Sequence, residues 1–219
     1  MIESILPAEV VAIEVYDDPP EAVLLPEEEP VVAKAVDKRR REFTTVRHCA
    51  RQAMARLGVP PAPILPGERG APTWPAGIVG SMTHCAGYRA AVLALDTDLR
   101  SVGIDAEPHV PLPEGVLEAV SLPEERVHLA ALAAGSRDVH WDKLLFAGKE
   151  SVYKAWFPLT RKWLGFSDAH IEFDPDGGFR ARLLVAGPVV DGVEITGFTG
   201  RWTVANGIAA TAIAVPVKA

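Results

Sequence analysis

The stretch Ser101-Val-Gly-Ile-Asp-Ala-Glu-Pro108 is largely apolar at first and then carries two acids directly before a proline. It is typical of a short strand, and side chains two apart on a strand project to the same face. Asp105 and Glu107 therefore present two carboxylates side by side. Such carboxylates repel each other unless a cation lies between them, and oxygen ligands suit Mg²⁺. The alternative is a strand end with two solvated acids, which is the common case for an isolated Asp-x-Glu triplet.

Around this strand the chain alternates apolar strand-like runs with helical ones. The strands are indicated by β-branched runs or turn residues, and they are Val10–Val15, Gly77–Met82, Tyr88–Leu95, Ser101–Ala106 and a hairpin at Asn206-Gly207. The helices are indicated by apolar spacing or a capping box, and they are about Val31–Leu57, one opened by Ser121-Leu-Pro-Glu124, and about Asp138–Phe157. Helix, loop and hairpin follow in this order up to about residue 108 and again beyond it. The order predicts an α+β fold of two similar halves, 1–108 and 109–219, with a ligand cleft between them.

Composition narrows the class of protein. The 219 residues carry 22 Lys and Arg against 29 Asp and Glu, a formal net charge of −7, which argues against a general nucleic-acid binder. The two cysteines form neither a disulfide framework nor a zinc pattern, and the first residues lack the character of a secretory signal. The longest apolar stretch, Gly207–Val217, is too short to span a membrane. We therefore expect a cytoplasmic protein that binds neither nucleic acid nor membrane.

A second set of charged residues lies in the predicted helix Asp138–Phe157. Glu150 and Lys154 are four residues apart, so they share a helix face. By itself this spacing indicates a surface ion pair. Gly148, however, weakens an otherwise strong helix. A small residue at this place leaves room for a ligand or another backbone beside Lys149 and Glu150.

Basic residues gather on the predicted helix Val31–Leu57. Arg40 and Arg47 lie seven residues apart, nearly on one line, and Arg39 lies toward their flank. Several guanidiniums at a helix start oppose the helix dipole unless an anion or an acidic cluster meets them. The helix is therefore either an anion-binding surface or a solubilising face beside the acids Glu27–Glu29.

Thr83, His84 and Cys85 stand at the end of the first hairpin strand. A histidine in this position can donate to a phosphate, although a lone strand-end histidine is more often structural. A thiol nucleophile at Cys85 with His84 as its base is disfavoured, because neighbours on a strand point to opposite faces.

Taken in this order, the motifs resemble those of the 4′-phosphopantetheinyl transferases of the surfactin-synthetase type found in bacteria. The family signatures (V/I)-G-(I/V)-D-x-E and (F/W)-x-x-K-E-(A/S)-x-x-K stand here as Val102–Glu107 and Phe146–Lys154. The Ser-x-(T/S)-H segment stands as Ser81–His84. The resemblance covers Pro26 to Gly165, about two thirds of the chain.

The resemblance implies a monomer of two pseudo-symmetric α/β halves with coenzyme A in the cleft between them. It implies a Mg²⁺ ion, or Mn²⁺ in its place, held against the pyrophosphate by Asp105, Glu107 and Glu150. It also implies contacts to coenzyme A from a set of cationic and hydroxyl side chains, which are Arg39, Arg47, Arg69, Thr83, His84, Lys149 and Lys154. Arg69 is the nearest base in the loop Leu65–Pro72.

The implied reaction is attack of a serine hydroxyl of an apo carrier protein on the β-phosphorus of coenzyme A, which releases 3′,5′-ADP. The partners are acyl and peptidyl carrier proteins of fatty-acid, polyketide or nonribosomal-peptide synthases, including siderophore synthesis. Catalysis falls to Asp105, Glu150 and Lys154. Glu150 is the expected base, with Glu124 or a metal-bound hydroxide as rivals. Phosphoryl transfer of this kind depends mostly on positioning and charge neutralisation.

Two other functions use the same residues. One is a Mg²⁺-dependent phosphohydrolase of nucleotides or coenzyme A, with water as the nucleophile. The other is a binding protein for coenzyme A or carriers that has lost turnover, and the presence of all three carboxylates and Lys154 counts against it. For carrier docking we expect an exposed apolar patch in the helix after Pro113, formed by Val116, Leu117 and Val120.

Overall fold

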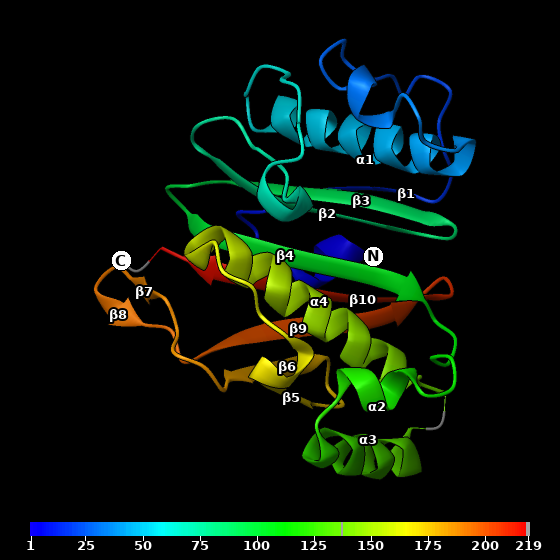
Figure 1. Ribbon diagram of the computed structural model, residues 1–219, viewed down its shortest axis with the longest axis vertical. Helices are drawn as coiled ribbons and strands as arrows, with labels where there is room; N and C mark the ends of the chain where they lie inside the picture. Colours follow the sequence, from blue (N-terminus) through cyan, green and yellow to red (C-terminus); the bar gives the residue numbers. More distant parts are fainter. Residues whose placement is uncertain (137, 218–219) are drawn as a thin grey trace.

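The strands form two main antiparallel sheets that lie side by side in the middle of the molecule (Figure 1). In the computed structural model, which describes residues 1–136 and 138–217, the first sheet has the order β1-β3-β2 and the second the order β4-β10-β9-β6-β5. The strands are β1 Val11–Val15, β2 Ile78–Cys85, β3 Tyr88–Leu95, β4 Leu99–Pro108, β5 Ala169–Phe173, β6 Gly178–Leu183, β7 Val189–Val190, β8 Val193–Glu194, β9 Gly197–Ala205 and β10 Ile208–Pro216. The helices are α1 Asp37–Arg56, α2 Val116–Val120, α3 Pro123–Gly135 and α4 Trp141–Thr160, with 3₁₀ turns η1 Ile2–Ile5, η2 Glu29–Val32, η3 Glu68–Gly70 and η4 Phe166–Asp168. The predicted α+β class is confirmed.

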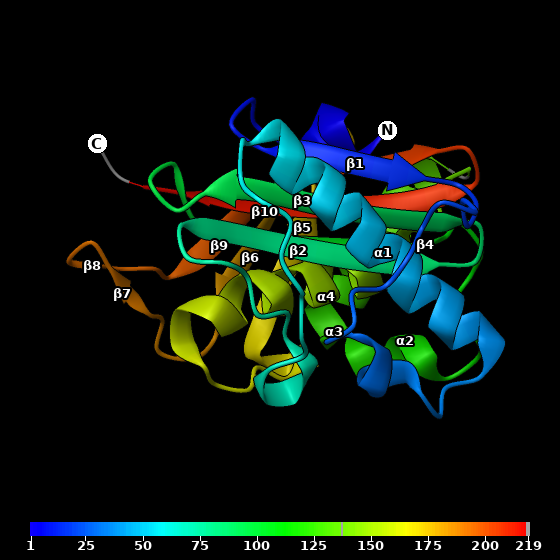
Figure 2. The ribbon, with the colours of Figure 1, turned by 90° about the horizontal axis from the view of Figure 1, so that it is seen from above.

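Helix α1 packs on the first sheet (Figure 2). Cys49, Ala53 and Met54 of the helix are fully buried against strand residues of this sheet. The predicted start at Val31 is wrong: a 3₁₀ turn occupies residues 29–32, and the extended backbone of Val36 delays the α-helix until residue 37. The predicted end is confirmed, because Gly58 takes the left-handed φ of +72° directly after the helix.

Strand β4 pairs with β10 rather than with the hairpin that precedes it in the chain. Asp105 lies opposite Thr211 in this pairing, and Glu107 lies opposite Ala209. The other side of β4 lies along β2, so the two sheets meet at these two strands. The predicted boundary between the two halves, after Pro108, thus assigns β4 to the first half, although β4 is hydrogen-bonded into the second sheet.

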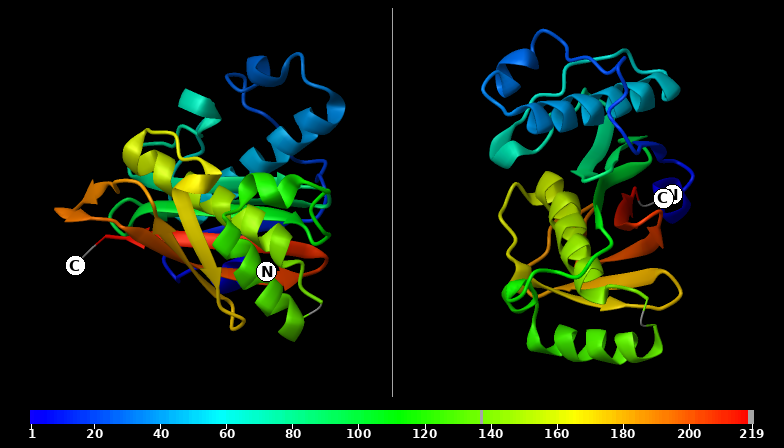
Figure 3. Two further views of the ribbon diagram at one scale, coloured as in Figure 1. Left: turned by 60° about the horizontal axis from the view of Figure 1, so that its bottom comes forward. Right: turned by 90° about the vertical axis from the view of Figure 1, so that its right-hand side faces the viewer.

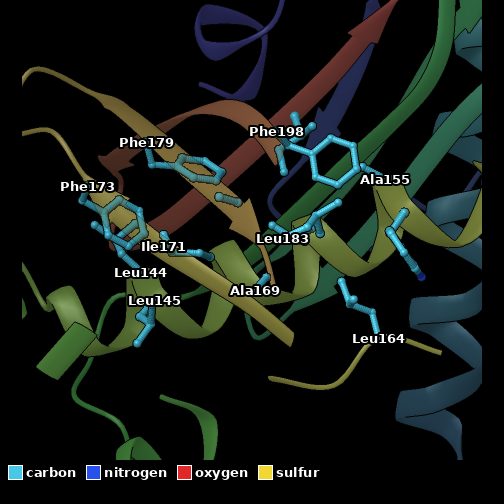
Figure 4. Packing of buried hydrophobic residues seen from close by; sticks show 14 of the residues in the cluster. Leu144, Leu145, Ala155, Leu164, Ala169, Ile171, Phe173, Phe179, Leu183 and Phe198 are labelled. Carbon is cyan, nitrogen blue, oxygen red and sulfur yellow. The ribbon is translucent and has the colours of Figure 1, made fainter. Parts of the chain in front are cut away.

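Helix α4 lies across the second sheet and buries the predicted apolar stripe, which is formed by Trp141, Leu144, Leu145, Val152 and Trp156; Figure 4 shows Leu144 and Leu145. It begins at Trp141 rather than at about Asp138, because the residue before it has a non-helical ψ of 82°. It extends beyond the predicted end at Phe157 and closes at Arg161, whose N–H still donates to the Phe157 carbonyl and whose left-handed φ of 56° then turns the chain out of the helix. Contact with β4 is closest at Gly103, where a Cβ atom would lie 2.2 Å from the Ser151 carbonyl oxygen. Only glycine fits at that point of β4.

Helix α3 lies at one end of the molecule, on the side of the second sheet (Figure 3). Its first turn is capped one residue later than predicted, since the N–H of Leu122 donates to Glu125 Oε2 at 2.8 Å. Beside it, Val120 of α2 is buried and Leu117 packs against the core around α4. The prediction of an exposed docking patch is therefore wrong for Val120, which is buried, whereas Val116 and Leu117 are partly exposed.

The predicted hairpin at Asn206-Gly207 is confirmed. Both residues have positive φ, 52° and 73°, and they join β9 to β10 in the two-residue turn that suits a twisted hairpin. The small hairpin of β7 and β8 projects from the side of the molecule (Figure 1). Within residues 1–136 and 138–217, no helix is both long and apolar enough to cross a membrane.

Candidate active site

A cavity of about 680 Å³ lies between α1, the loop that follows it, β2 and α4. A volume of this order is common for small-molecule sites, which run from roughly 300 to 1,000 Å³. Titratable side chains from both parts of the chain line the cavity, and they include Arg39, Arg47, Arg69, His84, Glu150 and Lys154. Six of the side chains predicted to serve the site therefore share one space.

The wall formed by α1 and β2 is cationic. Arg39 Nη1 lies 2.9 Å from His84 Nε2, and His84 Nδ1 lies 3.4 Å from Glu42 Oε2. Because arginine only donates, Nε2 accepts and the Nδ1–H points to the carboxylate. Burial lowers the pKa of His84; Glu42 opposes the shift and the positive charge of Arg39 adds to it. A neutral His84 thus holds Arg39 against the cavity wall.

Arg47 forms a second, buried part of this wall. Its Nε donates to the Ile64 carbonyl at 2.8 Å, and its guanidinium lies 3.2 Å from the centroid of the Phe43 ring. Burial lowers the pKa of Arg47 to about 10, so the side chain keeps its charge at neutral pH. The fully buried Glu28 lies 3.9 Å from Arg47 and binds Arg51 Nη1 at 2.9 Å. These contacts fix the position of the Arg47 charge.

The three predicted acids act on one another electrostatically. Burial raises the pKa of Glu150, and the charge of Asp105 raises it further. Burial also raises the pKa of Glu107, and both Asp105 and Glu150 add to that shift. Glu107 is 4.0 Å from Lys143 Nζ, which partly balances its charge. Asp105 itself is buried, and its Oδ2 atom has no hydrogen-bond partner.

The Lys154 ammonium binds Asp105, one of these three acids, and also backbone carbonyls of both sheets. Its Nζ donates to Asp105 Oδ1 at 2.8 Å, to the Ile104 carbonyl of β4 at 2.9 Å and to the Met82 carbonyl of β2 at 3.3 Å. A lysine ammonium has three N–H donors, so all of them bind protein oxygens here. The positive charge of Lys154 is thereby held at the place where the two sheets meet.

Comparison with known proteins shows the family of the chain. Residues 27–94 match the model of the 4′-phosphopantetheinyl transferase N-terminal domain, and residues 101–204 match that of the 4′-phosphopantetheinyl transferase superfamily. The transferase Svp of Streptomyces mobaraensis is 56% identical over 100% of this chain and 91% of its own. The transferase PptT of Mycobacterium tuberculosis is 53% identical over 97% of each chain. This chain belongs to the 4′-phosphopantetheinyl transferase family.

A more distant relative matches part of the transferase. Enterobactin synthase component D of Salmonella typhi is 31% identical over 118 residues, which are 54% of this chain and 48% of the relative. The fold and the enzyme class expected from the sequence motifs are thus confirmed.

The donors in the transferase fit a divalent cation that binds together with substrate. Among the residues that the structure describes, no three His, Cys, Asp or Glu side chains form a ready-made metal cluster. Yet Asp105 Oδ2 is a buried oxygen without a partner, and the raised pKa values of Glu107 and Glu150 reflect burial and repulsion between acids that Lys143 and Lys154 only partly offset. Mg²⁺ is commonly held by only one or two carboxylates plus substrate phosphates. The three carboxylates, with one oxygen of Asp105 free of protein donors, match that mode of binding.

The structure places Lys149 outside the cavity and so gives no support to the prediction that it binds coenzyme A. Its ammonium is buried away from the cavity and lies 2.8 Å from Glu125 Oε1. It also donates to the carbonyls of Phe166 at 2.7 Å and Ala169 at 2.6 Å. Successive helix residues are rotated by about 100°, so Lys149 faces the protein interior while Glu150 faces the cavity.

Other predicted residues occupy different places. The buried Thr83 does not line the cavity, and its hydroxyl donates to Asp105 Oδ1 at 3.2 Å. Arg69 is exposed at the cavity wall, with its guanidinium 5.6 Å from the Trp163 ring centroid. Glu124 is exposed on α3 and does not line the cavity, so the structure gives no support to it as the base. Burial raises the pKa of the Cys85 thiol to about 12, against any role as a thiolate.

Sequence reasoning missed two residues of the site. Lys143 lies on α4 seven residues, or about two helical turns, before Glu150, and this spacing could have placed it on the side of the acids. Tyr153 lines the cavity and has a buried hydroxyl without a partner. Its position next to Lys154 in the motif is the only signal of it in the sequence.

Proposed function

We propose that this transferase moves the 4′-phosphopantetheine group of coenzyme A to a serine of apo acyl or peptidyl carrier proteins. The carriers belong to fatty-acid, polyketide or nonribosomal-peptide synthases, and the enzyme acts as a monomer in the cytoplasm. The observation that carries the proposal is the arrangement of charge. A cationic wall and the Glu150 carboxylate share one cavity, and Asp105 and Glu107, which do not line it, lie close enough to Glu150 to interact with it electrostatically. Such an arrangement suits a substrate with phosphates and a divalent cation.

The role of each residue follows from its charge. Arg39 and Arg47 would bind coenzyme A phosphates on the α1 wall, since arginine suits phosphate recognition. Asp105, Glu107 and Glu150 would hold Mg²⁺, or Mn²⁺ in its place, which when bound neutralises the diphosphate. Lys154 keeps a fixed positive charge beside Asp105. Preorganised charge of this kind lowers the barrier because no reorganisation is needed during the reaction.

Glu150 is the proposed base. Burial raises its pKa, which brings the carboxylate closer to the working pH and makes it a better proton acceptor than an exposed glutamate. The serine oxygen forms a bond to the β-phosphorus while the bond to 3′,5′-ADP breaks. The serine proton passes to Glu150, directly or through water.

Intact-mass spectrometry of an apo carrier tests the proposal. Incubation with enzyme, coenzyme A and Mg²⁺ should add one phosphopantetheine to the carrier, and an unmodified carrier would refute the function. A reaction without carrier serves as the control and should release no 3′,5′-ADP.

The role of Glu150 has its own test. Glu150→Gln should keep coenzyme A binding and lose transfer by about 10²- to 10⁴-fold, the range for a general base. Glu172→Gln is the matched control, because Glu172 is exposed on β5 outside the cavity. Full activity of Glu150→Gln would remove Glu150 from the mechanism.

A further inference from the structure

Strands β2 and β4 run side by side where the two sheets meet, but side chains join them instead of a backbone ladder. The Ser81 hydroxyl oxygen accepts the N–H of Ile104 at 3.1 Å. The Thr83 hydroxyl oxygen accepts the N–H of Ala106, also at 3.1 Å. Both side chains are buried, and both pairs advance by two residues. The hydroxyls thus take the place that carbonyl oxygens hold in an ordinary sheet.

The Thr83 hydroxyl also contacts the Asp105 carboxylate. Its single O–H donor goes to Asp105 Oδ1, the atom that Lys154 binds as well. Asp105 Oδ1 therefore receives two donors from protein groups, and Oδ2 receives none. Such a division holds the carboxylate in one orientation and leaves one oxygen for a ligand. Because the donor of Thr83 is already in use inside the protein, it is not offered to the cavity.

We propose that Ser81 and Thr83 are positioning residues of the transferase. Their hydroxyls join β2 to β4 at a fixed separation, and Thr83 orients the Asp105 carboxylate within this seam. Thr83 thus acts through Asp105 rather than by touching coenzyme A. The inference rests on the proposed function, since it assigns Asp105 a part in holding the divalent cation.

Kinetics of Thr83→Val distinguish a residue that acts through Asp105 from one that contacts coenzyme A. Valine keeps the shape of the side chain and removes the hydroxyl, so kcat should fall about 10- to 100-fold, as is common when a group that orients a metal ligand is lost. The KM for coenzyme A should stay unchanged. Thr83→Ser keeps the hydroxyl and should restore kcat. Thr45→Val is the matched control: Thr45 is a buried threonine whose hydroxyl donates to Asp18 at 2.8 Å, and its loss should leave kcat unchanged.

A binding measurement provides a readout that does not depend on turnover. Titration of Mn²⁺ with coenzyme A present, followed by electron paramagnetic resonance of the free ion, should show an affinity about 10- to 100-fold weaker in Thr83→Val. Ser81→Ala, which leaves both donors to Asp105 in place, should lower kcat with no change in the KM for coenzyme A. It also keeps the test valid if Thr83→Val does not fold.

Three results would overturn the inference. They are a raised KM for coenzyme A with unchanged kcat in Thr83→Val, a Thr83→Ser variant as slow as Thr83→Val, and full activity of Ser81→Ala. Activity of the wild-type protein distinguishes these results from failure of the proposed function. If the wild type modifies no carrier protein, the proposed function itself is wrong. If it modifies the carrier and one of the three results is found, only the role of the hydroxyls is wrong.

Discussion

The ion pair between Lys149 and Glu125 is a structural contact, and its removal should destabilise the protein without changing ligand binding. The two side chains are 2% and 0% exposed, and their charged atoms lie 2.8 Å apart. Glu125 also accepts the N–H groups of Ile171 at 2.7 Å and Leu122 at 2.8 Å. Lys149→Met keeps an unbranched side chain one atom shorter but leaves a buried carboxylate without its cation. Breaking a buried pair in this way costs about 3–5 kcal/mol.

This loss is large against the stability of a typical domain, about 5–15 kcal/mol. For a chain of this size it corresponds to a Tm lower by roughly 6–20 °C. Urea unfolding followed by tryptophan fluorescence measures the free energy of unfolding. Changing Glu125 to Gln in the same chain removes the orphaned charge and should recover part of the loss. The exposed Lys162→Met is the control and should change the free energy of unfolding by less than about 0.5 kcal/mol.

Binding of coenzyme A decides between this reasoning and a role for Lys149 in the cavity. Folded Lys149→Met protein should bind coenzyme A as tightly as the wild type in calorimetry. A weaker affinity together with unchanged stability would refute the structural role and return Lys149 to the site.

Two further predictions concern the core and the loop after β4. Gly103→Ala should destabilise the protein by about 1–3 kcal/mol or more, because the new Cβ would lie 2.2 Å from the Ser151 carbonyl oxygen. Gly135→Ala is the control and should cause no loss, since the space around Gly135 is open. Equal stability of the two variants in thermal unfolding would contradict the packing argument. His109 accepts the N–H of His140 at 2.9 Å, and burial lowers the pKa of His109, with the neighbouring imidazole adding to the shift. The unfolded chain therefore takes up a proton before the folded one does, so this residue makes stability fall as the pH drops below about 6.5. His109→Gln should show a smaller fall in Tm between neutral and mildly acidic pH, and an unchanged pH dependence would contradict this.

Local patterns predicted the elements whose cause is local. The Asn206-Gly207 turn follows from the positive φ that these two residues tolerate. The stripe on α4 follows from helical spacing alone, and the same spacing places Glu150 and Lys154 on one face. The acids at Asp105 and Glu107 followed from the alternation of a strand.

The errors arose where distant parts of the chain decide the outcome. Nothing near β4 indicates that it pairs with β10, about a hundred residues later in the chain. Lys149 was assigned to the cavity because it stands beside Glu150 in the motif, but its partner is Glu125 on another helix. Val120 of α2 was expected to face a carrier, since the sequence does not show that this side chain is buried in the fold.

The division of charge between the two sheets has a consequence for the lifetime of the enzyme. Arg39 and His84 belong to the side of α1 and β2, whereas Asp105 and Glu150 belong to β4 and α4. If coenzyme A binds residues of both sides, as proposed, its binding free energy would stabilise the native state. Saturation with substrate should therefore slow digestion by proteases, and starvation for it should hasten turnover of the polypeptide.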